Sequence, residues 1–142
     1  MHFVDAKSIL SAKNGMNIYR GCTHGCIYCD SRSDCYNMQH DFEDVEVKRN
    51  APELLEKALA SKRRLCMIGT GAMSDPYMHC EEKLRLTRRC LEVIDRHGFG
   101  VTVLTKSDMI LRDADLLCSI NSKAKAVVQM TLTTYDEDLC RI

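Results

Sequence analysis

The amino-acid sequence predicts an α/β fold in which about four βα units form part of a parallel barrel that does not close. Apolar segments with strand character alternate with helical segments along all 142 residues, as in right-handed βα units. No linker rich in Pro, Gly or Ser interrupts this alternation, which indicates a single domain. A closed barrel of eight units takes roughly 250 residues, so we expect residues 1–142 to be one core domain, truncated on its C-terminal side.

The first predicted strand covers residues 16–20, and Gly21 marks the turn that leads from its end into a cysteine-rich loop. Apolar and charged residues alternate over residues 45–48, which favours a second, short strand. Asn50 can then cap a helix that runs to about Ser61 and buries one leucine-rich face. The cysteine-rich loop therefore lies between two strands that precede the first helix.

The middle of the chain continues the alternation. Residues 65–69 form a continuous apolar run, which suits a strand that is buried on both faces. A long helix is predicted over residues 81–97, with acids in its first turn, bases in its last turn and Gly98 at its end. The next strand covers residues 101–105, where β-branched residues predominate.

The last part of the chain supplies a further helix and strand. Ser107 can cap a helical stretch that reaches about Ile120. A strand is predicted over residues 126–133, and residues 135–142 have the character of another helix opening. The last strand of an unclosed parallel sheet has unpaired backbone groups, so we expect a continuation of the chain or a partner to cover that edge.

The charge balance of the chain gives no overall electrostatic field. Twenty basic residues offset twenty acidic residues, so the chain as a whole attracts neither nucleic acid nor an anionic membrane. Basic clusters at residues 62–64 and along residues 83–89 could contact phosphates, although a solvated face is the simpler interpretation of both. No run of about 18 apolar residues occurs, so we expect a cytoplasmic protein without a membrane partner.

Nine cysteines, an odd number, cannot all pair in disulfides. Four lie in apolar segments, where a free cysteine usually behaves as a small buried hydrophobic residue: Cys66, Cys90, Cys118 and Cys140. Three others lie in one short polar loop at positions i, i+4 and i+7: Cys22, Cys26 and Cys29. Because these three share a compact loop, their thiols can converge on one centre. Cys35 lies nearby in the sequence, and we assign it no role.

Three chemistries could use the loop thiols. Thiolates are the ligands of iron–sulfur clusters, and three ligands on a cubane cluster leave one iron open. A zinc site would need a fourth ligand, for which Cys35 or His24 is available, but zinc sites usually combine two separate ligand pairs. A redox dithiol formed by Cys26 and Cys29 would leave Cys22 unexplained. A cubane cluster with one open iron uses all three thiols, and zinc and a redox dithiol stay open as alternatives at this point.

Three segments of the chain resemble a known family: residues 19–30, residues 69–77 and residues 104–107. The first contains the three cysteines, separated by three and then two residues, with Tyr28 just before the last. This loop resembles the signature of the radical S-adenosylmethionine superfamily. The three segments together resemble its spore photoproduct lyase-related branch, whose members are described as DNA repair photolyase-like. The resemblance covers the N-terminal part of the radical S-adenosylmethionine barrel.

The resemblance implies a 4Fe–4S cluster and S-adenosylmethionine as cofactors. It implies an enzyme that cleaves the cofactor reductively to a 5′-deoxyadenosyl radical, which abstracts hydrogen from a substrate, with the lyase-like chemistry of this branch. It further implies an electron donor of the flavodoxin or ferredoxin type. The substrate is unknown, with DNA as one candidate.

The resemblance also implies roles for individual residues. Iron ligands are implied at Cys22, Cys26 and Cys29. Contacts with S-adenosylmethionine are implied at five positions: Tyr28 beside the adenine, Ser74 and Asp75 at the amino group, Lys106 at the carboxylate, and Thr131 as a hydroxyl contact. A turn that also caps a helix is the structural alternative for Ser74 and Asp75. A solvated lysine at a strand end is the alternative for Lys106.

One departure from the branch concerns the hydrogen donor. Ala72 and Met73 stand where spore photoproduct lyase is expected to present a cysteine, and Cys66 and Cys80 are too far along the chain to be assumed substitutes. The resemblance therefore does not extend to thymine-dimer repair. Two rival interpretations are a non-catalytic cluster protein that carries electrons and an inactive fragment of a longer enzyme.

Overall fold

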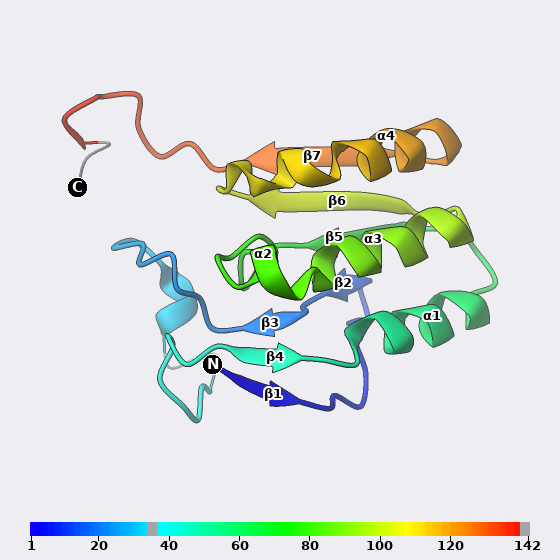
Figure 1. The fold of residues 1–142 in the computed structure, drawn as a ribbon, viewed down its shortest axis with the longest axis horizontal. Helices are drawn as coiled ribbons and strands as arrows, with labels where there is room; N and C mark the ends of the chain where they lie inside the picture. The colour runs from blue at the N-terminus through cyan, green and yellow to red at the C-terminus, as the bar shows by residue number, and fades with distance from the viewer. Residues whose placement is uncertain (34–36, 140–142) are drawn as a thin grey trace.

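The computed structural model describes residues 1–33 and 37–139. It confirms the predicted class, because the strands form open, mainly parallel sheets with helices in the connections (Figure 1). Its larger sheet contains, in spatial order, β2 (Gly15–Met16), β5 (Met67–Thr70), β6 (Gly100–Thr105) and β7 (Ala126–Met130), all parallel. Its smaller sheet contains β1 (His2–Val4), β4 (Glu46–Lys48) and β3 (Tyr19–Arg20), with β1 parallel and β3 antiparallel to β4.

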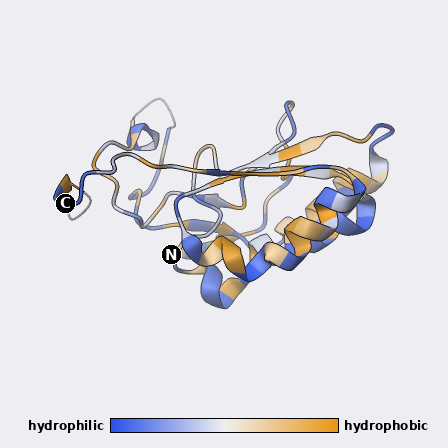
Figure 2. Ribbon diagram, turned by 90° about the horizontal axis from the view of Figure 1, so that it is seen from above, coloured by the Kyte–Doolittle hydropathy of each residue, from blue (hydrophilic) through white to orange (hydrophobic). Residues whose placement is uncertain are grey.

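The α-helices lie on one side of the strands (Figure 2). They are α1 (Ala51–Ser61), α2 (Glu81–Leu84), α3 (Leu86–His97) and α4 (Ala114–Lys123), and two 3₁₀ helices are η1 (Asp30–Arg32) and η3 (Asp108–Asp113). Helix α3 packs between α1 and α4, and its Leu91 and Ile94 are fully buried. Val101 and Val103 of β6 and Val47 of β4 are buried as completely, so the core lies between the helices and both sheets.

The strand predicted over residues 16–20 is divided between the two sheets. Residues 15–16 form β2 beside β5, whereas residues 19–20 form β3 beside β4. Met16 and Tyr19 are both buried, so each short strand places an apolar side chain in the core. The division gives the cysteine loop a base in the smaller sheet.

The single helix predicted over residues 81–97 is broken in the structure. Arg85 adopts a left-handed conformation with φ of +51° and separates α2 from α3. The cause is the buried carboxylate of Glu81, whose two oxygens accept hydrogen bonds from the backbone N–H groups of Leu86 and Thr87 at 3.1 and 3.0 Å. The carboxylate thus caps α3 from inside the core, which a continuous helix would not permit.

Other elements differ from the prediction in smaller ways. The N-terminal strand β1 was not predicted, because its three residues carry no apolar alternation of useful length. Ser107 does act as a cap, since its hydroxyl accepts from the N–H of Met109 at 3.3 Å, but the following turn is 3₁₀ before α4 begins. Cys118 is exposed rather than buried, and Cys140 lies outside the described residues.

The larger sheet ends at β7. No described strand pairs with the outer side of β7, and Val128 and Met130 are exposed there. Residues 131–139 leave the sheet without forming the predicted helix, while residues 140–142 lie outside the described part of the chain. Within that part, no helix is both long and apolar enough to cross a membrane.

Candidate cluster and cofactor site

One cavity of about 210 Å³ lies where the cysteine loop meets the carboxyl ends of β5, β6 and β7. All eight residues to which the sequence assigned a role line it: Cys22, Cys26, Tyr28, Cys29, Ser74, Asp75, Lys106 and Thr131. The carboxyl ends of parallel strands meet at one edge of a sheet, so residues that are distant in the sequence converge there. This topology explains why the eight residues meet in one cavity.

The cysteine loop is anchored at its first residue. Gly21 has a φ of +91°, and a Cβ atom there would lie 2.4 Å from the carbonyl oxygen of Phe42. The same oxygen accepts a hydrogen bond from the N–H of Cys22 at 3.0 Å. Only glycine allows this close approach, so Gly21 sets the direction in which the loop leaves β3.

The three loop sulfurs share the cavity without gathering as a single-ion site. Among the described residues, they do not form a set whose ligand atoms lie within 4.8 Å of one another. A cubane cluster binds each thiolate through a different iron, so its ligands surround a larger centre than one zinc ion does. The described thiols therefore do not form a ready single-ion site, and Cys35 of the zinc alternative lies outside the described residues.

Cys22, the first cysteine of the loop, has a thiol whose pKa is changed by burial. Burial raises the pKa of the Cys22 thiol, and backbone hydrogen bonds from His24 and Asp75 offset only part of that increase. A thiol must lose its proton to bind iron, so cluster assembly at Cys22 is coupled to proton release.

Asp75 connects the end of β5 to the end of β6. Its Oδ1 accepts from the N–H of Tyr77 at 2.9 Å and from the hydroxyl of Thr105 at 2.6 Å, and its Oδ2 accepts from the N–H of Lys106 at 2.9 Å. His24 Nε2 lies 3.5 Å from Oδ2 without the geometry of a hydrogen bond. Burial alone would raise the pKa of Asp75, but these polar neighbours lower it overall. Asp75 is therefore ionised and holds the two strand ends together.

Ser74 differs from Asp75 in having no partner. Its hydroxyl oxygen is buried at the cavity wall and makes no hydrogen bond within the described structure. A buried hydroxyl without a partner carries a free-energy penalty of about 1–3 kcal/mol. Three thiols and an unsatisfied hydroxyl in one cavity suit a site for a cluster and a polar small molecule.

Lys106 reaches across the cavity to the cysteine loop. Its Nζ lies 2.7 Å from the sulfur of Cys26 and 2.7 Å from the hydroxyl oxygen of Tyr28. Burial would lower the pKa of Lys106, but the thiol and the hydroxyl together raise it, so the side chain is a cation. The cavity therefore contains one fixed positive charge next to the thiols.

Gly71 makes the entry from β5 into the cavity wall possible. Its φ is +101°, and a Cβ atom there would lie 1.9 Å from the carbonyl oxygen of Leu104 in β6. The sequence interpretation gave no cofactor role to four further polar residues that line the cavity: His24, Asp30, Ser31 and Thr105. Thr105 was detectable as the last residue of a predicted strand, whereas Ser31 carries no pattern that distinguishes it.

A second cavity of about 220 Å³ adjoins the first and shares Ser31, Met73 and Ser74 with it. Two basic side chains line this second cavity, Arg20 and Lys48. Burial lowers the pKa of Lys48, with Glu46 opposing and Arg20 adding to that effect. The second cavity is therefore partly shielded from water and carries basic groups beside Ser74.

The structure is a partial parallel barrel with a thiol-lined cavity at its strand ends, which is where barrel enzymes bind their ligands. These features are typical of barrel proteins that bind an iron–sulfur cluster. The chain belongs to the radical SAM superfamily, whose family model matches residues 16–142. Proteins of this superfamily use a 4Fe–4S cluster and S-adenosylmethionine, and the donors in the cavity suit both groups.

Relatives of known sequence are similar over most of this chain. An uncharacterized protein of Methanocaldococcus jannaschii is 33% identical over 138 residues, which are 96% of this chain and 50% of that protein. Uncharacterized proteins of Mycobacterium tuberculosis and Mycobacterium bovis are 29% identical over 134 residues, which are 89% of this chain and 39% of each relative. The chain thus spans half or less of these relatives. No solved structure matches it.

Proposed function

We propose that this chain binds a 4Fe–4S cluster through Cys22, Cys26 and Cys29 and cleaves S-adenosylmethionine reductively. The observation that carries the proposal is the single cavity that these thiols share with the polar ends of three parallel strands. Three protein ligands leave one corner of a cubane cluster free for a small molecule. When bound, the reduced cluster supplies the electron that cleaves S-adenosylmethionine into methionine and a 5′-deoxyadenosyl radical.

The polar residues of the cavity bind and orient the small molecule. The unpartnered hydroxyl of Ser74 is our proposed acceptor for its amino group, and the ammonium of Lys106 is the proposed partner of its carboxylate. Asp75 fixes the backbone of Lys106 and thereby positions that charge, and its carboxylate is our second proposed acceptor for the amino group. Tyr28, which is 56% exposed, and the exposed Thr131 lie at the open side of the cavity, where an adenosine group would cover them.

The proposed substrate is nucleic-acid related, in keeping with the spore photoproduct lyase-related resemblance and its lyase-like chemistry. Support comes from the second cavity, where Arg20 and Lys48 provide basic groups next to Ser74. The helical basic residues give less support, because Arg88 pairs with Asp113 and Asp115. We further propose that a flavodoxin or ferredoxin supplies the electrons. The proposed location is the cytoplasm, and the proposed role of this chain is that of one core domain of a longer protein.

The decisive experiment measures cofactor cleavage directly. Anaerobically reconstituted, dithionite-reduced protein is incubated with S-adenosylmethionine, and 5′-deoxyadenosine is quantified alongside iron content. We expect product from the native protein, and we expect Cys22→Ala, Cys26→Ala and Cys29→Ala to lose both iron and product. Cys118→Ala is the matched control, since Cys118 is exposed on α4 and remote from the cavity lining.

Two further outcomes have distinct meanings. Native protein that binds about four irons but yields no 5′-deoxyadenosine would favour an electron carrier over the proposed enzyme. Lys106→Met should weaken S-adenosylmethionine binding while iron content stays at the native level, and Lys123→Met on α4 should change neither. Equal cofactor affinity in Lys106→Met and Lys123→Met would remove Lys106 from the proposed site.

A further inference from the structure

A cluster of two histidines and one glutamate lies outside the cysteine cavity. His2 begins β1 and Glu46 begins β4, and the parallel register pairs these two residues directly. Paired residues of neighbouring strands project on the same face of a sheet, so the two side chains lie together. The loop before β4 adds His40, whose ring is perpendicular to that of His2 with the centroids 4.9 Å apart.

The hydrogen bonds of the two histidines leave one nitrogen of each ring available. Nδ1 of His2 lies 2.9 Å from a carboxylate oxygen of Asp44, and Nδ1 of His40 lies 3.0 Å from the carbonyl oxygen of Asp41. Carboxylate and carbonyl oxygens only accept hydrogen bonds, so Nδ1 donates in both rings. In the neutral ring Nε2 then carries a free lone pair. Histidines that bind metals are commonly oriented in this way by an acceptor on their other nitrogen.

The available nitrogen of His40 is buried without a hydrogen-bond partner. It lies 3.9 Å from Oε2 of Glu46, which is beyond hydrogen-bond distance. The side chains of His40 and Glu46 are only 19% and 20% exposed, so water does not readily satisfy either group. One ligand atom from each of His2, His40 and Glu46 lies within 4.8 Å of the others. An ion between them would satisfy the buried nitrogen and the carboxylate at once.

We propose that His2, His40 and Glu46 form a binding site for a divalent transition-metal ion, with Asp44 orienting His2 from outside the ligand set. Imidazole and carboxylate are ligands that zinc and iron(II) accept, and three protein ligands leave further positions for water. Asp44 also pairs with the N-terminal ammonium and Glu43 pairs with Arg32, so the negative charge offered to a cation is mainly that of Glu46.

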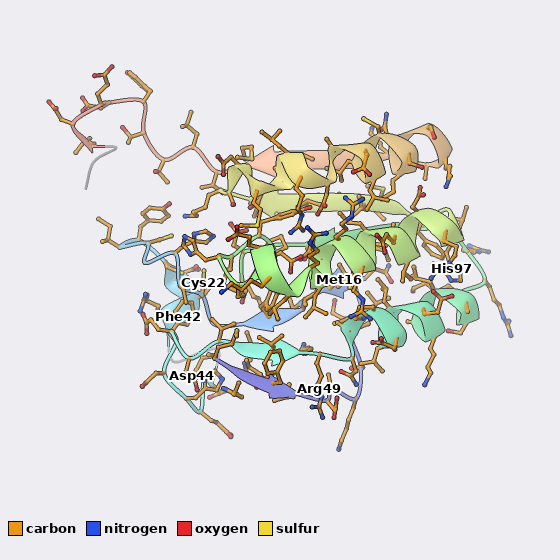
Figure 3. All side chains as sticks on the ribbon, viewed as in Figure 1. Met16, Cys22, Phe42, Asp44, Arg49 and His97 are labelled. Atoms are coloured by element: carbon orange, nitrogen blue, oxygen red, sulfur yellow. The ribbon has the colours of Figure 1, made fainter. Side chains whose placement is uncertain are left out.

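The position of the site gives it a structural consequence. Asp44 lies at the same end of the molecule as Cys22, with Phe42 between them in the view of Figure 3. The carbonyl of Phe42 anchors the first cysteine of the cluster loop, and His40 precedes Phe42 by two residues. A metal ion that joins His40 to β1 and β4 would therefore stabilise the segment at residues 40–42, whose Phe42 carbonyl accepts the hydrogen bond from Cys22.

Zinc binding to the cluster-loaded protein tests the site, because the cluster then occupies the loop thiols. The protein carries a histidine-free tag at its C-terminus and is titrated with zinc alone against a chromophoric chelator. We expect His40→Ala to lose one bound zinc per chain, and Asp44→Asn to weaken zinc binding by about 10–100-fold, as for other residues that orient a metal-binding histidine. His97→Ala is the matched control, because His97 pairs with Glu56 at the opposite end of the molecule (Figure 3). Its zinc binding should equal that of the native protein.

Zinc X-ray absorption of the loaded native protein provides a second test that needs no variant. Nitrogen and oxygen ligands at about 2.0–2.1 Å are expected, and a sulfur shell at about 2.3 Å would assign the zinc to cysteines instead. Equal zinc binding in native protein and His40→Ala would also overturn the proposal. Either test can fail while cofactor cleavage succeeds, so the two proposals of this article are separable.

Discussion

Replacing the buried Glu81 with alanine should destabilise the chain far more than replacing Glu82, the other acid of α2. Glu81 is fully buried and accepts hydrogen bonds from the hydroxyl of Tyr19, from two backbone N–H groups of α3 and from Arg112 at 3.1 Å. Burial and the nearby carboxylate raise the pKa of Tyr19, so its hydroxyl stays protonated as the donor. Alanine would leave the hydroxyl of Tyr19 and the two backbone N–H groups buried without their acceptor.

The size of the effect follows from the partners that remain. Breaking a buried ion pair by removing one member costs about 3–5 kcal/mol. Arg112 is 22% exposed and keeps Asp113 as a partner at 2.9 Å, so we expect the lower part of that range, about 3–4 kcal/mol. With a urea m-value of about 2 kcal/mol/M, the midpoint of unfolding should fall by about 1.5–2 M.

Urea unfolding followed by circular dichroism measures this change, and Glu82→Ala is the matched control. Glu82 is the exposed neighbour in the same short helix, so its loss should alter the free energy of unfolding by no more than about 0.5 kcal/mol. A difference of less than about 1 kcal/mol between the two variants would refute the reasoning, because it would mean that the buried acceptor contributes no more than an ordinary hydrogen bond.

Three further predictions concern other positions in the fold. Gly71→Ala should cost about 2–4 kcal/mol of unfolding free energy, because a Cβ would overlap a carbonyl of β6. Gly98→Ala also has a positive φ but open space around it, so it should cost only about 1–2 kcal/mol. Equal urea midpoints for the two variants would contradict the clash. Asp75→Asn should be less stable than the native protein at neutral pH. Because folding lowers the pKa of Asp75, this difference in unfolding free energy should persist above about pH 4 and shrink as the pH falls below it. Urea titrations at several pH values would measure it. Asn50→Ala should cost about 1–2 kcal/mol in the same assay through loss of two 2.9 Å hydrogen bonds to the backbone of Ala6, and an unchanged midpoint would show that water replaces them.

The sequence predicted the fold class and most elements because their signals are local. Apolar strands, a capping serine and a glycine at a helix end each act within a few residues. The division of the strand at residues 16–20 depends instead on which distant strand each half meets. The break at Arg85 likewise depends on Glu81 turning into the core beside Tyr19, a contact across 62 positions.

The family resemblance selected the residues of the candidate site, and the topology of the sheet explains why they lie together. Strand ends in a parallel sheet share one edge, so Ser74, Lys106 and Thr131 could be placed together without knowing any contact. The bonds that distinguish the occupied carboxylate of Asp75 from the unpartnered hydroxyl of Ser74 required coordinates. The pairing of His2 with Glu46 could not be predicted either, because the short strand β1 carries no strand pattern in the sequence. The roles assigned to all of these residues stay predictions.

The open side of β7 has a consequence for experiments on this chain at high concentration, because unpaired strand edges favour aggregation. No other described strand pairs with the outer edge of β7, where Val128 and Met130 are exposed, and such an edge can add a strand of a second copy. Val128→Lys would place a charge on that row and should keep the isolated chain monomeric without touching the thiols. Such a variant would let cluster assembly and cofactor cleavage be measured free of self-association.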